Sequence, residues 1–196
     1  METTLAPEIW MEIHARRKSM SMEQQHLFLE LLEQVPTRVQ VLGWLYYYGA
    51  LRTSEVKRVR RDHICNVRNF VAVRSSKRRN APKGSPNWRT IPLPCHVIQT
   101  LLELPVGDDQ PLFPEHRTTL LRWIQPLLEA VGCEGPAATT RTFRHSFKDR
   151  SEKQKNPISV TANLLGHSKR TDRQHYGDPM GYELATFAKE TWEVRC

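Results

Sequence analysis

The side chains best suited to chemistry in this 196-residue sequence are arginines at short, repeated distances from other polar groups. Arg52 precedes Glu55 by three residues, which places both on the same face of an expected helix start. Arg141 and Arg144 have the same spacing, and His145 follows directly. The planar guanidinium of arginine donates two parallel hydrogen bonds to a phosphate or a carboxylate. These groups therefore favour a phosphate-containing substrate.

A histidine, a tyrosine and a lysine complete the set of reactive side chains. His167 ends the run Leu164-Leu165-Gly166-His167, and Tyr176 follows nine residues later. Lys77 lies at the tip of an expected hairpin. Tyrosine is a weak nucleophile because its phenol pKa is about 10, but neighbouring cations favour the phenolate. A tyrosine placed among these cations could attack a phosphorus atom.

Taken singly, each group also has an ordinary structural interpretation. Arg52 and Glu55 could form a surface ion pair, and Lys77 could be one of the many lysines found on hairpins. The run Tyr46-Tyr47-Tyr48 lies in an apolar helix, so we interpret it as part of the core rather than as a source of nucleophiles.

Positive charge is concentrated in two parts of the sequence. The formal net charge is +8. Residues 52–89 contain 12 Lys/Arg against two acidic residues, and residues 139–176 contain nine against three, so the remainder carries −8. This pattern favours a phosphate-rich partner, because neutralising phosphates releases condensed counterions. No apolar run is long enough to span a membrane, the N-terminus lacks a signal-peptide pattern, and scattered cysteines fit reduced thiols. We expect a cytoplasmic protein.

Hydrophobic periodicity predicts a mainly α-helical protein with a small three-stranded antiparallel β-sheet. Ser21 and Gln24 have capping-box spacing before the first helix, which Pro36 ends, and Thr37 is expected to cap a second helix that stops at Gly49. Strands are expected in 64–74 and 89–93, on either side of a loop over 80–86. The expected helices cover 22–35, 37–49, 53–60, a segment after 94, 120–131 with Gly132 closing it, 142–153, 157–165 and 182–192.

Together, the motifs resemble the catalytic constellation of the tyrosine recombinase (phage integrase) family. The family pattern is an arginine in a G-L-R-x-x-E context, a hairpin lysine, an H-x-x-R-H box, an L-G-H box and a tyrosine shortly afterwards. The resemblance covers roughly residues 36–182. The matching positions are, in order, Arg52 with Glu55, Lys77, Arg144 with His145, His167, and Tyr176. The resemblance implies the catalytic-domain fold of this family and an enzyme that cuts and rejoins DNA.

It also implies a role for each matched position. Arg52 and Arg144 would hold the two non-bridging oxygens of the scissile phosphate, with His167 as a third donor. Tyr176 would attack the phosphorus to form a 3′-phosphotyrosine, and Lys77 would protonate the departing 5′-hydroxyl. Reversal by another 5′-hydroxyl would complete strand transfer.

Two supporting positions and one departure accompany these roles. Glu55 would orient the arginine cluster, and His145 would support it. Arg141 occupies the first position of the H-x-x-R-H box, where the family usually has histidine. Arginine donates hydrogen bonds to a phosphate but cannot act as a general base near neutral pH. We expect no metal or other cofactor, since the sequence has no acidic cluster to hold Mg²⁺.

The expected partner is double-stranded DNA, bound by a homo-oligomer, a tetramer in this family. Phosphate contacts are predicted for Lys57, Arg58, Arg60, Arg61, Arg78, Arg79 and Lys83. We expect residues 1–20 to be an N-terminal segment or linker and residues 21–196 to be the catalytic domain. Its C-terminal helix is either a core helix or one that docks on a neighbouring protomer. The chain would be an excised catalytic domain or a one-domain bacterial or phage-type recombinase.

Two alternatives share this fold or chemistry. One is a DNA-binding accessory protein with an impaired site, of which Arg141 would be a symptom. The other is an enzyme like the type IB topoisomerases, which would relax DNA without assembling partners. A metal-dependent nuclease is disfavoured for want of clustered carboxylates.

Overall fold

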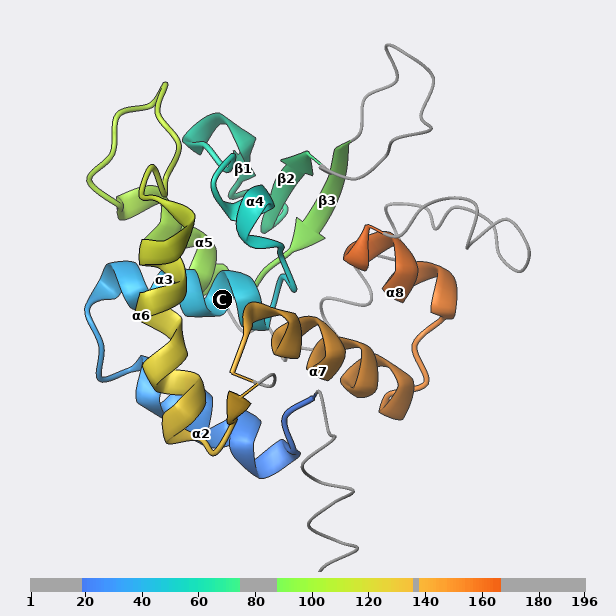
Figure 1. The fold of residues 1–196 in the computed structure, drawn as a ribbon. Coiled ribbons are helices and arrows are strands. Elements are labelled where there is room, and N and C mark those ends of the chain that lie inside the picture. Colours follow the sequence, from blue (N-terminus) through green and yellow to red (C-terminus); the bar gives the residue numbers. More distant parts are fainter. Residues whose placement is uncertain (1–18, 75–87, 136–137, 167–196) are drawn as a thin grey trace, which may run out of the picture.

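A computed structural model describes residues 19–74, 88–135 and 138–166 of the chain. The three strands lie side by side at one end of a helical body, and α8 lies beside β3 (Figure 1). The elements are α2 (Met22–Leu32), α3 (Thr37–Tyr47), α4 (Thr53–Val56), η1 (Arg61–His63), β1 (Ile64–Cys65), β2 (Phe70–Arg74), β3 (Trp88–Pro92), α5 (Cys95–Glu103), α6 (Arg117–Ala130), α7 (Thr140–Lys153) and α8 (Ile158–Leu165). The predicted mainly α-helical fold with a three-stranded antiparallel sheet is confirmed.

The first two helices follow the sequence signals, with one correction. The capping box of α2 is present: the Ser21 hydroxyl accepts a hydrogen bond from Gln24 N–H, and the Gln24 side chain accepts one from Ser21 N–H. The prediction that Thr37 caps α3 is wrong, because Pro36 occupies the cap position and Thr37 is the first helical residue. The backbone of Pro36, with φ −53°, is already set for the junction, so no side-chain cap is used.

The turn between α3 and α4 places Arg52 and differs from the expected glycine stop. It is Ala50, not Gly49, that adopts a positive φ of 46°. Gly49 is needed for space, since a Cβ there would lie 2.3 Å from Cδ1 of Leu51 and 2.8 Å from the Leu45 carbonyl oxygen. The tight turn leads directly into α4, with Arg52 at its cap position.

The stretch predicted as β over 64–74 forms two strands joined by a turn. Asn69, at the end of the turn, has φ 49°, a conformation that asparagine tolerates better than most residues. Strand β2 pairs antiparallel with both β1 and β3, and Val71 lies opposite Ile91. Strand β3 alternates between exposed and buried positions, so Arg89 and Ile91 face the interior.

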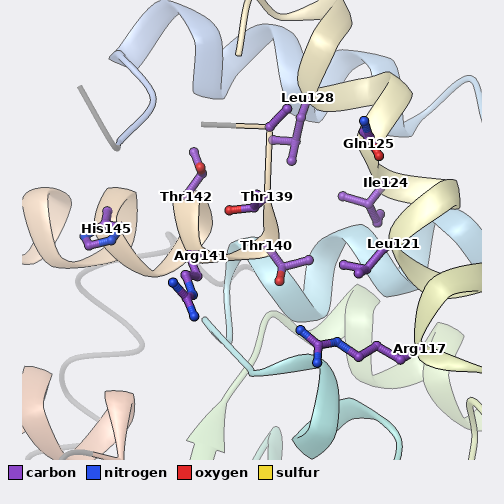
Figure 2. A pocket seen from close by; sticks show the side chains of 11 residues that line it. Arg117, Leu121, Ile124, Gln125, Leu128, Thr139, Thr140, Arg141, Thr142 and His145 are labelled. Atoms are coloured by element: carbon purple, nitrogen blue, oxygen red, sulfur yellow. The ribbon is translucent and has the colours of Figure 1, made fainter. Parts of the chain in front are cut away.

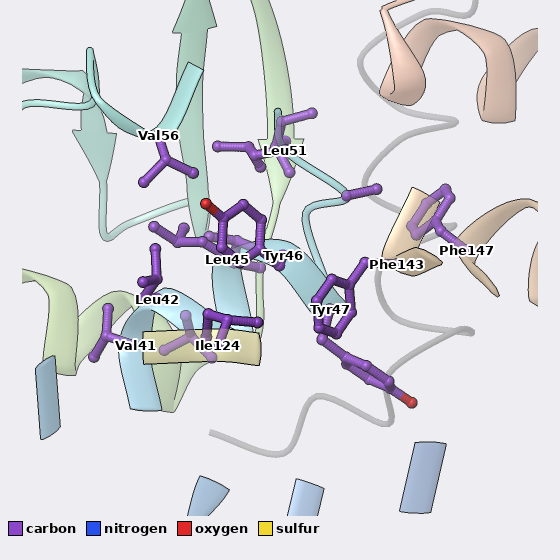
Figure 3. Close-up of a cluster of buried hydrophobic side chains, with 14 of the residues drawn as sticks. Val41, Leu42, Leu45, Tyr46, Tyr47, Leu51, Val56, Ile124, Phe143 and Phe147 are labelled. Carbon is purple, nitrogen blue, oxygen red and sulfur yellow. The ribbon is translucent and has the colours of Figure 1, made fainter. Parts of the chain in front are cut away.

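Aromatic rings from α2, α3 and α7 meet in the core. Figure 3 shows those of Tyr46, Tyr47, Phe143 and Phe147. The Tyr46 ring stacks on Phe143 with centroids 5.7 Å apart, and Phe28 approaches Phe143 at 4.9 Å. Arg150 of α7 lies over the Tyr47 ring at 4.1 Å and donates a hydrogen bond to the Tyr47 carbonyl. This packing fixes α7 against α2 and α3, and it confirms that Tyr46 and Tyr47 belong to the core.

The remaining helices agree with the periodicity within a few residues. Gly132, with φ 79°, follows α6 as expected, and α7 begins two residues earlier than predicted. The helix expected over 182–192 lies outside the described residues. No helix among those described is both long enough and apolar enough to cross a membrane.

Candidate active site

The carboxylate of Glu55 lies at the centre of the site, fully buried and shared by two arginines. Oε1 accepts hydrogen bonds from Arg52 Nη1 at 2.8 Å and from Arg89 Nη1 at 3.0 Å. Oε2 accepts from the Arg52 backbone N–H at 2.8 Å and from Arg89 Nη2 at 2.9 Å. Burial by itself would raise the pKa of Glu55, but the hydrogen bonds and charges of Arg89 and Arg52 together hold it below its ordinary value. Glu55 is therefore ionised at neutral pH, with both oxygens occupied.

Arg52 is held by one side of its guanidinium and leaves the other side accessible. Its backbone and its Nη1 atom both donate to Glu55, which fixes the side chain at the start of α4. The side chain is 20% exposed. Among the described residues, no hydrogen bond is made by its Nε or Nη2 atoms. These N–H groups can donate hydrogen bonds to an anionic ligand.

Arg144 lies against the same cluster and is bound to backbone carbonyls. Nη1 donates to the Ala50 carbonyl at 2.6 Å, and Nη2 donates to the Leu165 carbonyl at 2.5 Å. Burial, with the nearby Arg52 charge next in importance, lowers the pKa of Arg144 to about 9. The guanidinium therefore remains charged at neutral pH. Within the described part of the chain, its Nε–H and one N–H on each terminal nitrogen make no hydrogen bond and could serve a ligand.

The carboxyl end of α8 is held by two arginines. Arg89 Nε donates to the Leu164 carbonyl at 3.0 Å, one residue before the carbonyl that Arg144 binds. Cations at this end of a helix satisfy carbonyls that lack intrahelical partners. Gly166 then adopts φ 61°, and a Cβ there would lie 2.9 Å from Arg89 Nη1. The chain thus leaves α8 at a defined point, directly before His167.

Arg89 is a site residue that the sequence analysis missed. The sequence predicts only that Arg89 begins a strand. The available signal was the alternation of β3, which places Arg89 on the same face as the apolar Ile91. An arginine on a buried strand face requires an anionic or carbonyl partner. No spacing or motif in the sequence identifies Glu55 as that partner.

Hydroxyl groups connect the two arginine-bearing helices beneath the site. The Tyr46 hydroxyl donates to Thr53 Oγ1 at 3.1 Å, and Thr53 Oγ1 lies 3.4 Å from Thr140 Oγ1. Thr53 is in α4 and Thr140 is the first residue of α7. This series of hydroxyl groups therefore links the helices of Arg52 and Arg144. Burial raises the pKa of Tyr46 to about 12, which keeps its phenol neutral.

Arg141 and His145 lie on the exposed side of α7 and line a solvent-open cavity of about 620 Å³ between α7 and α6. Figure 2 shows the side chains of Arg141 and Arg117 at the same end of this cavity. Arg117, the first residue of α6, was not singled out by the sequence analysis. Its exposed position has no sequence signal, because only the packing of α6 beside α7 brings it close to Arg141.

No family model matches the chain, but individual proteins do. The tyrosine recombinase XerA of Thermococcus onnurineus is 26% identical over 168 residues, covering 81% of this chain and 57% of that protein. XerA of Pyrococcus furiosus is 27% identical over the same length. The fold resembles that of a solved XerA recombinase, with a TM-score of 0.63, 18% identity and coverage of 89% of this chain and 65% of that one.

The chain therefore resembles tyrosine recombinases in sequence and shares the fold of their catalytic domains. A solved XerH recombinase bound to a palindromic difH substrate gives a TM-score of 0.61 at 16% identity, over 90% of this chain and 53% of that one. The integrase of the Tn1549 transposon, solved with transposon right end DNA, gives 0.59 at 17% identity, over 91% of this chain and 67% of that one. The chain spans a little over half the length of the curated tyrosine recombinases that it matches.

In this tyrosine recombinase fold, the structure brings together Arg52, Glu55 and Arg144, three of the residues predicted from the motifs. Arg141 and His145, also on α7, line the cavity between α7 and α6, which Arg144 does not line. Six of the predicted site residues lie outside the described part of the chain. They are Lys77, Arg78, Arg79, Lys83, His167 and Tyr176.

The basic residues after α4 differ in what they contact. Lys57 is half-buried and Arg58 is exposed. Arg60 pairs with Asp62 at 3.1 Å on the surface. Arg61 Nη2 donates to the Leu104 and Val106 carbonyls at 2.8 and 2.9 Å. These contacts favour a structural role for Arg61 over the predicted phosphate contact.

Proposed function

We propose that this chain is the catalytic domain of a site-specific DNA recombinase. It would cleave and rejoin DNA strands through a covalent 3′-phosphotyrosine formed by Tyr176. The observation that carries the proposal is the Arg52–Glu55–Arg144 cluster, in which two charged guanidinium groups are oriented by protein contacts and retain unused donors. The similarity in sequence and fold to tyrosine recombinases supports the same reaction class.

The cluster suits a phosphodiester under attack by an oxygen nucleophile. Negative charge then develops on the two non-bridging oxygens, and preorganised donors stabilise it without reorganisation during the reaction. Arg52, Arg89 and Arg144 carry three positive charges against the single carboxylate of Glu55. The excess positive charge would attract the phosphate and favour the phenolate of Tyr176. Lys77 would protonate the 5′-hydroxyl that leaves, and His167 would donate a third hydrogen bond.

Arg141 would act as a donor to the DNA rather than as a base. Its exposed side chain lies on the cavity side of α7, one helical turn from Arg144. A guanidinium there can bind a phosphate but cannot accept the Tyr176 proton near neutral pH. Proton removal would then depend on the cationic surroundings of the tyrosine or on water.

Double-stranded DNA is the proposed partner, bound by a tetramer of the chain. Residues 21–196 would form the catalytic domain, with residues 1–20 as a preceding segment. Lys57, Arg58 and Arg60 would contact phosphates together with the hairpin residues Arg78, Arg79 and Lys83. Two of the structural neighbours were solved bound to DNA, which supports this choice of partner.

The test is a nicked DNA substrate that traps the covalent intermediate by losing the short strand carrying the 5′-hydroxyl. We would incubate it with the wild-type chain and with Tyr176→Phe, and separate the products under denaturing conditions. A library of random duplexes supplies candidate sites. An adduct formed by wild type and absent from Tyr176→Phe is the expected result.

Tyr47→Phe is a matched control, because Tyr47 is a buried core tyrosine whose ring packs against Arg150, away from the Arg52–Glu55–Arg144 cluster. It should retain the adduct. Binding of DNA by wild type with no adduct on any substrate would instead favour a DNA-binding accessory protein. Relaxation of supercoiled plasmid by a monomer without a specific site would favour a topoisomerase-like enzyme.

A further inference from the structure

Arg89 makes more charged contacts with the site than either proposed phosphate ligand, yet it is almost inaccessible to DNA. Its residue is 7% exposed, and its side chain 4%. Both of its terminal nitrogens donate to Glu55, and its Nε atom donates to the Leu164 carbonyl. The guanidinium therefore hydrogen-bonds to protein groups on two sides, to Glu55 on one and to the end of α8 on the other.

The contact with Glu55 determines how Arg52 is presented. Of the four hydrogen bonds that the carboxylate accepts, two come from Arg89 and two from Arg52. Without Arg89, a buried carboxylate would keep only Arg52 as its cationic partner, and two acceptor sites would be empty. Such a carboxylate either takes up a proton or draws in the remaining cation. Both outcomes change the side of Arg52 that faces a ligand.

The contact with Leu164 determines where the segment after α8 begins. Arg89 and Arg144 bind successive carbonyls at the end of this helix, and Gly166 follows in a left-handed conformation. The close approach between Gly166 and the Arg89 guanidinium leaves no room for a side chain at this point. Arg89 therefore holds the carboxyl end of α8 up to Gly166.

We propose that Arg89 is a positioning residue that couples strand β3 to both arginines of the active site, presenting Arg52 through Glu55 and holding the carboxyl end of α8, which Arg144 also binds, through Leu164. It acts without touching DNA. This inference rests on the proposed recombinase function for its catalytic consequence. Its structural part, the positioning of Arg52 and of the end of α8 at Gly166, is independent of that function.

The variants are chosen to separate positioning from general stability. Arg89→Lys keeps the charge and most of the stem, but a single ammonium cannot bridge both Glu55 oxygens and the Leu164 carbonyl. Arg38→Met is the matched control, because Arg38 also binds a glutamate, Glu115, at 2.7 Å and a backbone carbonyl, that of Leu112, at 2.8 Å. None of these Arg38 contacts belongs to the site.

The first readout is the single-turnover rate of adduct formation at saturating nicked DNA, measured at a temperature where each variant is folded. Arg89→Lys should slow this step by about 10²-fold, the typical effect of a small misplacement of a catalytic group, with DNA affinity nearly unchanged. Arg38→Met should react at the wild-type rate. Equal losses in both variants, in proportion to their lowered melting temperatures, would overturn the proposal.

The double variant Glu55→Leu with Arg89→Met gives a sharper distinction. Replacing both members of a buried ion pair by apolar residues often restores stability. A positioning role predicts that stability recovers while the cleavage rate stays low. Recovery of the rate together with stability would mean that Arg89 only holds the fold.

The second readout does not require activity. Nuclear magnetic resonance of ¹⁵N-labelled protein reports the Arg52 side-chain Nε–H and the backbone N–H groups of Gly166 and His167. We expect all three signals to shift or broaden in Arg89→Lys and to stay in place in Arg38→Met. Unchanged signals would overturn the proposal. Shifted signals in a protein whose wild type forms no adduct would leave the positioning role standing and reject the recombinase function.

Discussion

Arg89 and Glu55 meet in a two-point contact, with nitrogen–oxygen distances of 3.0 and 2.9 Å, although they lie 34 residues apart in the sequence. Both side chains are buried, and the carboxylate is also held by Arg52. A strand residue thereby becomes part of a site whose recognisable motifs all lie in other segments. The contact also makes Glu55 the most consequential single position in the described part of the site.

Replacing Glu55 by glutamine should strongly destabilise the protein. The amide keeps one acceptor oxygen but presents an NH₂ group to donors, and it leaves the buried Arg89 and the partly exposed Arg52 without a counter-charge. Removing one partner of a buried ion pair typically costs about 3–5 kcal/mol in the free energy of unfolding. Chemical denaturation followed by circular dichroism measures the change.

Glu115→Gln is the control for this variant. Glu115 pairs with Arg38 at 2.7 Å, but both side chains are partly exposed, at 22% and 27%. Solvent screening should limit the loss there to about 1 kcal/mol or less. Similar losses at both positions would contradict the central role of Glu55.

Glu55 should also make stability depend on acid. Its folded pKa lies below the ordinary value of 4.5, so the folded state binds fewer protons than the unfolded state over that range. The stabilisation is fully present above pH 4.5 and is lost as the pH falls through the folded pKa. Unfolding free energies of wild type and Glu55→Gln, measured from neutral pH downward, should converge below pH 4.5. A constant difference at all pH values would be inconsistent with an ionised Glu55.

Substituting Arg141 by histidine should introduce a group that can accept a proton. We expect adduct formation to become faster and to rise with pH across the ordinary imidazole pKa of about 6.5, because general bases typically contribute about 10²–10⁴-fold. Arg141→Gln is the control, since glutamine donates hydrogen bonds but does not titrate. A rate for Arg141→His no higher than for Arg141→Gln would show that a base at this position is not limiting.

Arg117 should contribute to DNA affinity from the α6 wall of the cavity, at the same end as Arg141 of α7. Arg117→Ala should weaken binding to all DNA sequences alike and reduce the slope of log affinity against log salt by about 1. Fluorescence anisotropy at several salt concentrations measures this slope. Arg122→Ala is the control, because Arg122 is exposed on the same helix but does not line the cavity. An equal effect of both substitutions would point to net charge rather than to a phosphate contact.

The sequence by itself determined the local part of this protein. The capping box at Ser21 and Gln24 and the pairing of Arg52 with Glu55 depend only on spacing within a turn of helix, which the chain satisfies before any tertiary contact forms. The order of the arginine, histidine and tyrosine motifs likewise pointed to the family. The helix periods predicted the mainly α-helical fold with errors of a few residues at the ends.

Only the tertiary structure decided which distant groups meet. Arg89 of β3 binds both Glu55 of α4 and the Leu164 carbonyl at the end of α8, the helix beside which β3 packs. Arg144 reaches the Ala50 and Leu165 carbonyls because α7 packs against α3 and α8. Arg61, predicted to contact DNA, donates through Nη2 to the Leu104 and Val106 carbonyls after α5. A backbone carbonyl is present at every residue and carries no sequence signal, so the partner of a buried arginine is set by packing and cannot be read from spacing.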